Sequence, residues 1–296
     1  MYHRIAEPAA DPWELAVSPA NFEAQIAWLK RRRTVLPLQE LEALRQQGRL
    51  PRDAVAVTFD DGYACNALIA APIAAAHEAP ITIFLTTGAL SGDAEFWWDD
   101  LERIVSGATP LRLEISIAGE DLALELSEPG QGLTGPRAEA YTTLWRALRP
   151  LDTATRQLAM STLAKQCGVG TAGRPEYRAM TQMEIGELVK SPWVSFGAHS
   201  VNHPPLSELT AAEQRFEIET SRDACAELTG QAPRMFAYPY GDYSEETVQL
   251  VREAGFKVAV TTDSGVITGG SESLRLPRVQ VGDWPEAKFA ELFASQ

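Results

Sequence analysis

The sequence predicts a single α/β domain over residues 1–296, folded as a distorted (β/α)7 TIM-like barrel with a helical insertion. Three observations favour this fold class. Short apolar runs alternate with helical patterns along most of the chain, as expected of parallel β/α packing. Polar residues directly follow several of these runs, where barrel enzymes carry their functional side chains. The runs number about seven, and we expect strands near residues 1–5, 55, 81, 193, 235, 257 and 275.

The first part of the barrel is expected before residue 96. Ser18 and Pro19 form a cap and a first-turn proline, and apolar residues then recur at helical spacing, which predicts a helix over 19–32. A shorter helix is expected over 38–47. A strand over 55–59, an alanine-rich helix over 65–77 and a buried strand over 81–85 continue the alternation.

Residues 97–180 interrupt this alternation, because they contain no second complete set of strands and helices. Trp97 and Trp98 open a helix, a short hairpin is expected over 111–126, and two polar helices follow. We interpret the segment as an insertion or lid on one β/α loop. The run Phe96-Trp97-Trp98 is either a substrate platform or a core patch, and we favour the core.

The alternation resumes after residue 180, and each helix begins with a capping signal. Thr181 with Glu184 predicts a helix that ends near residue 190, ahead of a strand over 193–197. Thr210 with Glu213 predicts a longer helix, which ends at Gly230. The remaining elements are a strand over 235–237, a helix from Ser244 to Gly255 and a strand over 256–261.

Composition and charge narrow the classes of partner. The hydrophobic fraction of 45% and the charged fraction of 22% are typical of a folded globular protein. The net charge of −14 argues against nucleic acid or an anionic membrane as the main partner, so a neutral or cationic substrate is expected. The sequence lacks an apolar run long enough to span a membrane and the apolar core of a signal peptide, which predicts a cytoplasmic location. The oligomeric state is left open.

The sharpest motif is Thr58-Phe59-Asp60-Asp61-Gly62, at the end of a predicted strand. Two adjacent carboxylates repel each other unless a cation or a proton neutralises one of them. The alternative is an ordinary Asp-Gly turn that closes the strand. The motif therefore indicates a charged site only in combination with other residues.

Those other residues are His199 and His203, whose spacing of four brings both imidazoles to one side of a turn. With Asp61 they make a typical zinc ligand set with an open coordination position, which leaves Asp60 as a base. Two surface histidines are the alternative. Two histidines and a carboxylate also bind iron in non-haem oxygenases, although the adjacent Asp pair fits that class poorly.

A third motif, Tyr238-Pro239-Tyr240, forms a rigid turn after the strand at 235–237. Its aromatic rings suit packing against a sugar, and a backbone N–H could face a developing oxyanion. An ordinary Pro-Tyr-Gly loop is the alternative.

Together these residues resemble the polysaccharide deacetylase (NodB-homology) family of carbohydrate esterases. Residues 58–62 match the first motif of the family, and residues 199–203 match its H-[ST]-x-x-H motif. The third motif has the form FAYPYG over residues 236–241. The resemblance is strong over about 55–100 and 180–280, and it implies the family's distorted barrel.

The resemblance also implies a function and a role for each residue. Asp61, His199 and His203 would hold a divalent metal, most often Zn2+, with Co2+, Ni2+ or Mn2+ as alternatives. A metal-bound water would attack the acetyl carbonyl of an N-acetylated, or O-acetylated, sugar or glycan precursor, with Asp60 as the general base. The backbone N–H of Tyr240 would hold the oxyanion, and Tyr238 and Pro239 would contact the substrate.

Two departures from the family pattern affect the catalytic assignment. Many members carry an arginine in the third motif, and this chain has none there. The late Leu-x-His motif is replaced by Leu276-Pro277-Arg278, and an arginine is not a useful proton donor near neutral pH. We therefore predict that His3 replaces the catalytic acid, that Arg278 orients Asp60, and that Asp263 positions Arg275 or Arg278.

These departures leave an alternative open: a metal-containing carbohydrate-binding module whose catalysis is impaired. An intact Asp60 argues against this alternative, because a protein that only binds needs no base beside the metal.

Overall fold

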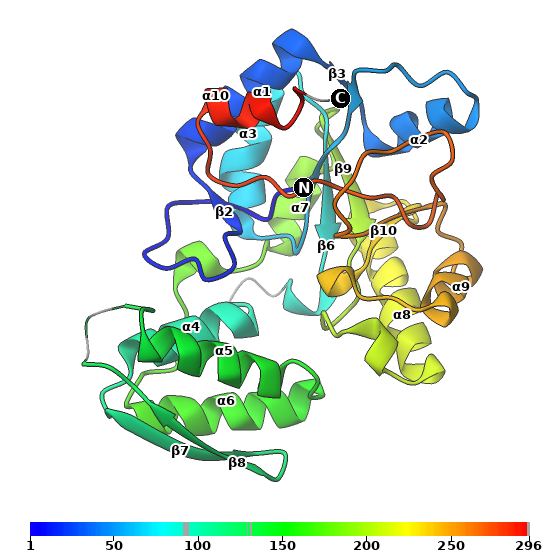
Figure 1. Cartoon of the computed structure of the whole chain (residues 1–296). Helices are drawn as coiled ribbons and strands as arrows, with labels where there is room; N and C mark the ends of the chain where they lie inside the picture. Colours follow the sequence, from blue (N-terminus) through cyan, green and yellow to red (C-terminus); the bar gives the residue numbers. More distant parts are fainter. Residues whose placement is uncertain (91–94, 129, 131, 295–296) are drawn as a thin grey trace. The chain divides into compact units, whose positions relative to one another are not determined.

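Five parallel strands form the main sheet, in the order β11-β10-β9-β6-β5. Figure 1 shows β6, β9 and β10 side by side in the computed structural model, which describes residues 1–90, 95–128, 130 and 132–294. The strands of the sheet are β5 (Val57–Phe59), β6 (Ile81–Leu85), β9 (Val194–Ala198), β10 (Met235–Ala237) and β11 (Val258–Val260).

Both edges of the sheet continue through single parallel bridges. Tyr2 pairs with Phe59 beside β5, and Leu276 pairs with Val260 beside β11. All seven predicted strand positions therefore lie in one parallel arrangement, although the first and last contribute bridges rather than full strands to the main sheet. Pro277, which has no N–H to donate, directly follows the last bridge. The predicted α/β barrel class is confirmed.

The chain divides into two compact units, which we call the barrel unit and the inserted unit. The barrel unit comprises Met1–Glu7, Glu14–Gly92 and Ala179–Gln296, and the inserted unit comprises Pro8–Trp13 and Asp93–Arg178. The insertion expected over 97–180 falls largely within the inserted unit. Its action as a lid remains a prediction.

The barrel unit contains short outer strands and the helices that follow the sheet strands. The outer strands are β1 (Arg4–Ile5), β2 (Ala16–Val17), β3 (Thr34–Val35) and β4 (Ala54–Val55). The helices are α1 (Pro19–Arg32), α2 (Leu38–Gln46), the π-helix η1 (Asn66–Ala70), α3 (Ala71–Ala76), the 3-10 helix η2 (Thr87–Ala89), α7 (Gln182–Leu188), η4 (Leu206–Glu208), α8 (Ala211–Thr229), η5 (Pro239–Gly241), α9 (Glu245–Glu253) and α10 (Glu286–Glu291).

The capping signals act as the sequence predicts. Thr181, Thr210 and Ser244 each accept a hydrogen bond from the backbone N–H three residues later, and all three form complete capping boxes. Gly230 ends α8 in the left-handed conformation, at φ 73°. These ends set where each helix returns the chain to the next strand.

Two elements differ from the sequence prediction. The strand expected over 55–59 is divided, because β4 pairs with β3 and only β5 joins the main sheet. The helix expected over 65–77 begins as the π-helix η1 and becomes α3 near Pro72. Proline cannot donate to the carbonyl four residues earlier and its ring crowds that carbonyl, so a wider turn ahead of Pro72 relieves the conflict.

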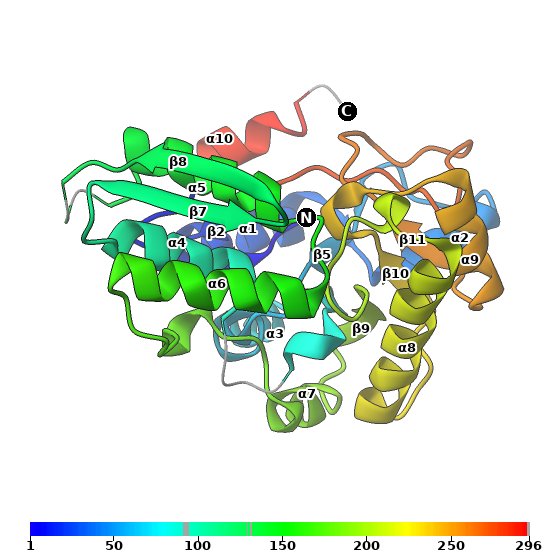
Figure 2. The same ribbon diagram turned by 90° about the horizontal axis from the view of Figure 1, so that it is seen from below.

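The inserted unit has a hydrophobic core of its own. It contains α4 (Trp97–Gly107), the antiparallel hairpin of β7 (Arg112–Ile117) and β8 (Glu120–Glu125), α5 (Pro136–Leu148), α6 (Thr153–Cys167) and the short helix η3 (Pro175–Tyr177). Figure 2 shows the hairpin lying along these helices. The predicted hairpin is confirmed, and Phe96 and Trp98 are buried at 4% and 6% exposure, as the core interpretation expects.

Among the described residues, no helix is both long enough and apolar enough to cross a lipid bilayer.

Candidate metal centre and active site

The candidate site lies where the parallel strands end. Asp60 and Asp61 directly follow β5, and His199 directly follows β9. Tyr240 lies in η5, just after β10. Because the carboxyl ends of parallel strands meet at one edge of a sheet, residues far apart in the sequence converge here.

Asp61, His199 and His203 form a buried group of potential metal ligands. Asp61 Oδ1 lies 3.5 Å from His199 Nε2 and 3.4 Å from His203 Nε2, and the two Nε2 atoms are 3.1 Å apart. A tetrahedral metal with bonds of 2.0–2.2 Å separates its ligands by about 3.3–3.6 Å. The three atoms are thus spaced as ligands of one small cation.

A backbone hydrogen bond fixes the orientation of one imidazole of the group. His199 Nδ1 lies 2.8 Å from the carbonyl oxygen of Ala237, which holds the proton on Nδ1 and leaves the Nε2 lone pair facing Asp61. Asp61 Oδ1 is buried, and no residue that the structure describes donates a hydrogen bond of ordinary geometry to it. A buried acceptor beside two imidazole nitrogens is an environment that a cation stabilises, so the residues fit a divalent metal.

The pKa values of the two imidazoles shift in opposite directions. Burial, reinforced by the neighbouring His199, lowers the pKa of His203 to about 3. Burial also acts to lower the pKa of His199, but the Asp61 and Asp60 carboxylates outweigh it and raise that pKa. One positive charge is therefore stable in this group while a second is not.

Four residues at the site hold the left-handed backbone conformation that residues other than glycine rarely adopt. The φ angles are 69° at Asp61, 55° at His203 and 58° at Tyr240, and Ser200 between the two histidines has a φ of 61°. Such conformations cost free energy and persist only where surrounding contacts impose them.

Asp60 is held by Arg278 in a buried ion pair. Both guanidinium Nη atoms donate to the carboxylate, each at 2.7 Å. Arg278 itself is fixed through Nε to the carbonyl of Thr261 at 2.8 Å and through Nη1 to the hydroxyl of Thr58 at 3.2 Å. Burial acts to raise the pKa of Asp60, but Arg278 outweighs it and keeps the pKa well below its usual range.

His3 lies near the carboxylate oxygen of Asp60 to which Arg278 Nη2 donates. Its Nε2 is 4.0 Å from Asp60 Oδ2, and its side chain is 13% exposed, more than either member of the ion pair. Asn66 Nδ2 donates to the His3 carbonyl at 2.8 Å and so fixes the backbone there. The structure brings His3, Arg278 and Asp60 together, and their chemical roles remain predictions.

The residues of the third motif divide between the site and the core. The ring of Tyr240 packs edge-on against the ring of His203, with centroids 4.4 Å apart. Tyr238 is fully buried, and its hydroxyl donates to the carbonyl of Leu274 at 2.9 Å. Pro239 is buried as well. The expected substrate contact of Tyr238 is thus corrected, since its side chain packs in the core and does not face a sugar.

The expected role of Asp263 also needs correction. Its carboxylate accepts a hydrogen bond from the Tyr243 hydroxyl at 3.1 Å, and only its backbone carbonyl meets Arg278, whose N–H donates at 2.9 Å. Arg275 forms ion pairs with Glu245 and Glu272. The Asp263 side chain therefore positions neither arginine, because the chain turns its carboxylate toward Tyr243.

Residues that support the site were missed by the sequence analysis. Thr58 and Thr261 hold Arg278, and Glu217 of α8 binds the loop between the two histidines. Nothing in the sequence marks Thr261. Thr58 belongs to the first motif, but its contact with Arg278 was not predicted. Glu217 carries one signal, since it shares a helix face with the buried residues Ile218 and Ser221. A carboxylate on a buried face needs hydrogen-bond partners.

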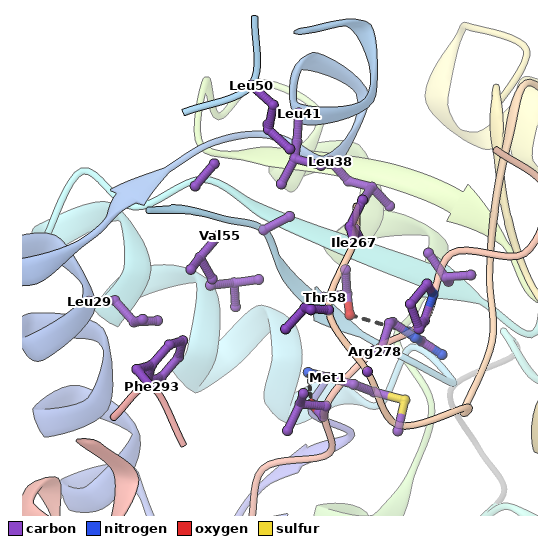
Figure 3. A pocket seen from close by; sticks show the side chains of 18 of the residues that line it. Met1, Leu29, Leu38, Leu41, Leu50, Val55, Thr58, Ile267, Arg278 and Phe293 are labelled. Carbon is purple, nitrogen blue, oxygen red and sulfur yellow. Dashed lines mark hydrogen bonds between the residues drawn. The ribbon is translucent and has the colours of Figure 1, made fainter. Parts of the chain in front are cut away.

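A cavity of about 590 Å³ lies inside the barrel unit, lined mainly by apolar side chains. Figure 3 shows Thr58 and Arg278 at its polar end, with the hydrogen bond between them dashed. Within the described residues, its lining includes none of the three potential metal ligands. The cavity therefore reaches the Arg278 side of the ion pair and is separate from the metal group.

Comparison with known proteins finds similarity to polysaccharide deacetylases. A polysaccharide deacetylase family model matches residues 152–259. The poly-β-1,6-N-acetyl-D-glucosamine N-deacetylase of Escherichia coli strain K12 is 24% identical over 298 residues, which cover 98% of this chain. The chain is related to the polysaccharide deacetylases. It spans 37% of the length of that E. coli relative.

Two solved structures of deacetylases share the fold of this chain. The Streptococcus pyogenes deacetylase PplD superposes with a TM-score of 0.61 at 19% identity, over 96% of this chain and 90% of that one. The de-N-acetylase of Aggregatibacter actinomycetemcomitans gives 0.60 at 16% identity, over 99% and 97% of the two chains. The resemblance to the NodB-homology family and its barrel fold are both confirmed.

Proposed function

We propose that this protein is a metal-dependent deacetylase that removes acetyl groups from an N-acetylated glycan or glycan precursor. The observation that carries the proposal is the convergence of Asp61, His199 and His203 within 3.5 Å of one another, next in sequence to a second carboxylate, that of Asp60. Three protein ligands leave an open position for substrate. A divalent metal, for which zinc is the first candidate, would supply Lewis acidity to the acetyl carbonyl and to water.

The side chains around this group would handle the protons. Asp60 is ionised because Arg278 neutralises its charge, so it can accept a proton from the attacking water. His3, 4.0 Å from Asp60, would give a proton to the departing amine. The backbone N–H of Tyr240, which lies beside His203, would donate to the oxyanion of the tetrahedral intermediate.

The class of substrate follows from the relatives and from charge. The name of the E. coli relative specifies a β-1,6-linked N-acetylglucosamine polymer, and we propose the same class for this chain. The substrate is uncharged and each deacetylation creates an amine, which suits a protein with a net charge of −14. Cleavage of the amide rather than an acetyl ester is part of the proposal.

Removal and return of the metal test the function. We expect chelation to abolish acetate release from β-1,6-linked N-acetylglucosamine oligomers, and Zn2+, Co2+, Ni2+ or Mn2+ to restore it. Asp61→Ala should lose both metal and activity, whereas the exposed Asp223→Ala should keep both. Acetate release that survives complete metal removal would contradict the proposal. Iron in the purified protein, with oxygen consumption, would support an oxygenase instead.

One observation favours the alternative of an impaired carbohydrate-binding module. Arg278 binds both oxygens of Asp60 and depresses its pKa, which weakens Asp60 as a base. Binding of the oligomers that depends on metal but releases no acetate would support the module. Acetate release from the same sample would exclude it.

A further inference from the structure

Glu217 is a buried acid that the proposed chemistry does not use. It lies on α8 and is only 6% exposed, on the helix face that also carries Ile218, Ser221 and Cys225. Burying a carboxylate costs free energy unless hydrogen bonds replace its water. The hydrogen bonds of Glu217 therefore indicate its structural role.

All of these contacts go to the loop between the two histidines. Glu217 Oε2 accepts from the backbone N–H groups of Val201 at 2.8 Å and Asn202 at 2.9 Å. Glu217 Oε1 accepts from Asn202 Nδ2 at 2.7 Å. One carboxylate thus satisfies three donors, on two consecutive residues, that would otherwise be without partners inside the protein.

The other side of the same loop is held by backbone groups. The N–H of Thr87 donates to the Ser200 carbonyl at 3.1 Å, and the N–H of Gly88 donates to the Val201 carbonyl at 2.9 Å. A side chain at position 88 would not fit, because a Cβ there would lie 2.7 Å from the Val201 oxygen. The loop is therefore clamped from two directions, with Glu217 supplying the only charged group of the clamp among the described residues.

The loop that Glu217, Thr87 and Gly88 hold has a strained backbone. Ser200 and His203 both adopt left-handed conformations, and the strain is relieved if the loop relaxes. Relaxation would separate the two Nε2 atoms that now lie 3.1 Å apart. Holding them together before a cation arrives is preorganisation of the ligand set.

We propose that Glu217 is a positioning residue for the metal site, which it preorganises by fixing the loop that carries His199 and His203. The proposal rests on the proposed metal-dependent function. It predicts that Glu217 acts on metal affinity more strongly than on the stability of the fold, since the contacts of its carboxylate are confined to this loop.

The test compares Glu217→Gln with Glu227→Gln, an exposed glutamate on the same helix. Zn2+ and Co2+ affinities are measured by competition with a chelating dye, the Co2+ absorption spectrum reports ligand geometry, and urea unfolding of the metal-free proteins reports stability. We expect Glu217→Gln to weaken metal binding about 10-fold or more and to alter the Co2+ spectrum. Glu227→Gln should change neither property.

Equal metal affinity in Glu217→Gln and the wild type would overturn the proposal. If that variant fails to fold, Asn202→Ala removes one of the three donors and should weaken binding by a smaller factor, whereas unchanged affinity there would also overturn it. A wild-type protein that binds no metal would instead refute the proposed function. The two failures are therefore distinguishable without any activity assay.

Discussion

Asp60 carries a negative charge inside the protein because Arg278 lies against it. The arginine comes from the position where related sequences are expected to carry the catalytic histidine, and it reaches the carboxylate that an arginine of the third motif was expected to orient. In our proposal, one residue late in the chain orients Asp60 in place of the absent arginine. The ionised state of Asp60 then depends mainly on Arg278, with smaller contributions from His199 and His3.

Replacing that neighbour should change the pH dependence of catalysis. In Arg278→Gln the burial of Asp60 is no longer opposed, so the pKa of Asp60 rises and the base is protonated at higher pH. We expect the acidic limb of the kcat/KM profile for acetate release to move upward by at least one pH unit. Arg278→Lys keeps a charge and should move it less. An unmoved limb in Arg278→Gln would show that Asp60 is not the titrating base.

His3 should be important for turnover and unimportant for metal binding. A general acid contributes about 10²–10⁴-fold to rate, so His3→Gln should lower kcat by about that factor while the metal content stays that of the wild type. His77→Gln is the matched control, because His77 lies on the surface beside Glu23. Steady-state acetate release and metal analysis check both variants. An undiminished kcat in His3→Gln would remove His3 from the mechanism.

At the scale of elements, tight packing between strands holds the site in place. Gly197 lies in β9, two residues before His199, and a Cβ there would lie 2.5 Å from the ring of Phe84 and 2.9 Å from the Met235 carbonyl. Phe84 belongs to β6 and Met235 to β10, the two neighbours of β9. The glycine therefore lets a large ring fill the space over β9.

Adding a methyl group at this point should destabilise the protein. We expect Gly197→Ala to lower the free energy of unfolding by about 1–3 kcal/mol, since the core must shift to admit it. Gly186→Ala in α7, where the new methyl meets no atom within 4 Å, should instead raise it by up to about 1 kcal/mol. Urea unfolding measures both. If Gly197→Ala left the free energy of unfolding unchanged, β9 would be able to shift and admit the methyl group without loss of stability.

Elements were predictable from sequence where their signals are local. The capped helices α7, α8 and α9 begin as expected because a cap depends on residues three apart. The division of the strand at β4 and β5 was not predicted, because it depends on which partner each half meets. The helix α10 was not predicted either, since its burial depends on packing against α1.

The same contrast applies to the site. Asp61, His199 and His203 could be recognised because few other tasks require those residue types at that spacing. Thr261, Glu217 and the contact of Thr58 with Arg278 could not, because a threonine or a glutamate becomes a support only through the neighbour that folding gives it. Tyr238 was misassigned for a related reason, since a motif does not reveal which of its rings points inward.

At the scale of the whole molecule, the two units keep separate cores. In the inserted unit, Arg137 is fully buried and donates to the backbone carbonyls of Val105, Ala108 and Ser127. These bonds tie α5 to the end of α4 and to the segment after β8. We therefore expect the stability of the inserted unit to depend on the buried guanidinium of Arg137.

Loss of Arg137 should therefore affect one unit and spare the other. We expect Arg137→Leu to destabilise the inserted unit by about 3 kcal/mol, because the buried carbonyls of Val105 and Ala108 and the partly buried carbonyl of Ser127 lose the guanidinium donors. The Zn2+ affinity that we propose for the barrel unit should remain at the wild-type value. Urea unfolding followed by fluorescence and by metal release separates the two effects. A parallel loss of metal affinity would mean that the units fold as one.

The left-handed backbone at Asp61, Ser200, His203 and Tyr240 has a consequence for engineering this protein. Each such residue lowers the free energy of unfolding by about 1 kcal/mol or more, so the backbone geometry of the site reduces the thermal stability of the protein. Ser200→Gly would relax the backbone at one of these positions without removing a proposed ligand, so we expect it to raise the melting temperature and to loosen the loop that carries both histidines. Selection for heat resistance alone would thus tend to weaken the proposed metal site first at Ser200.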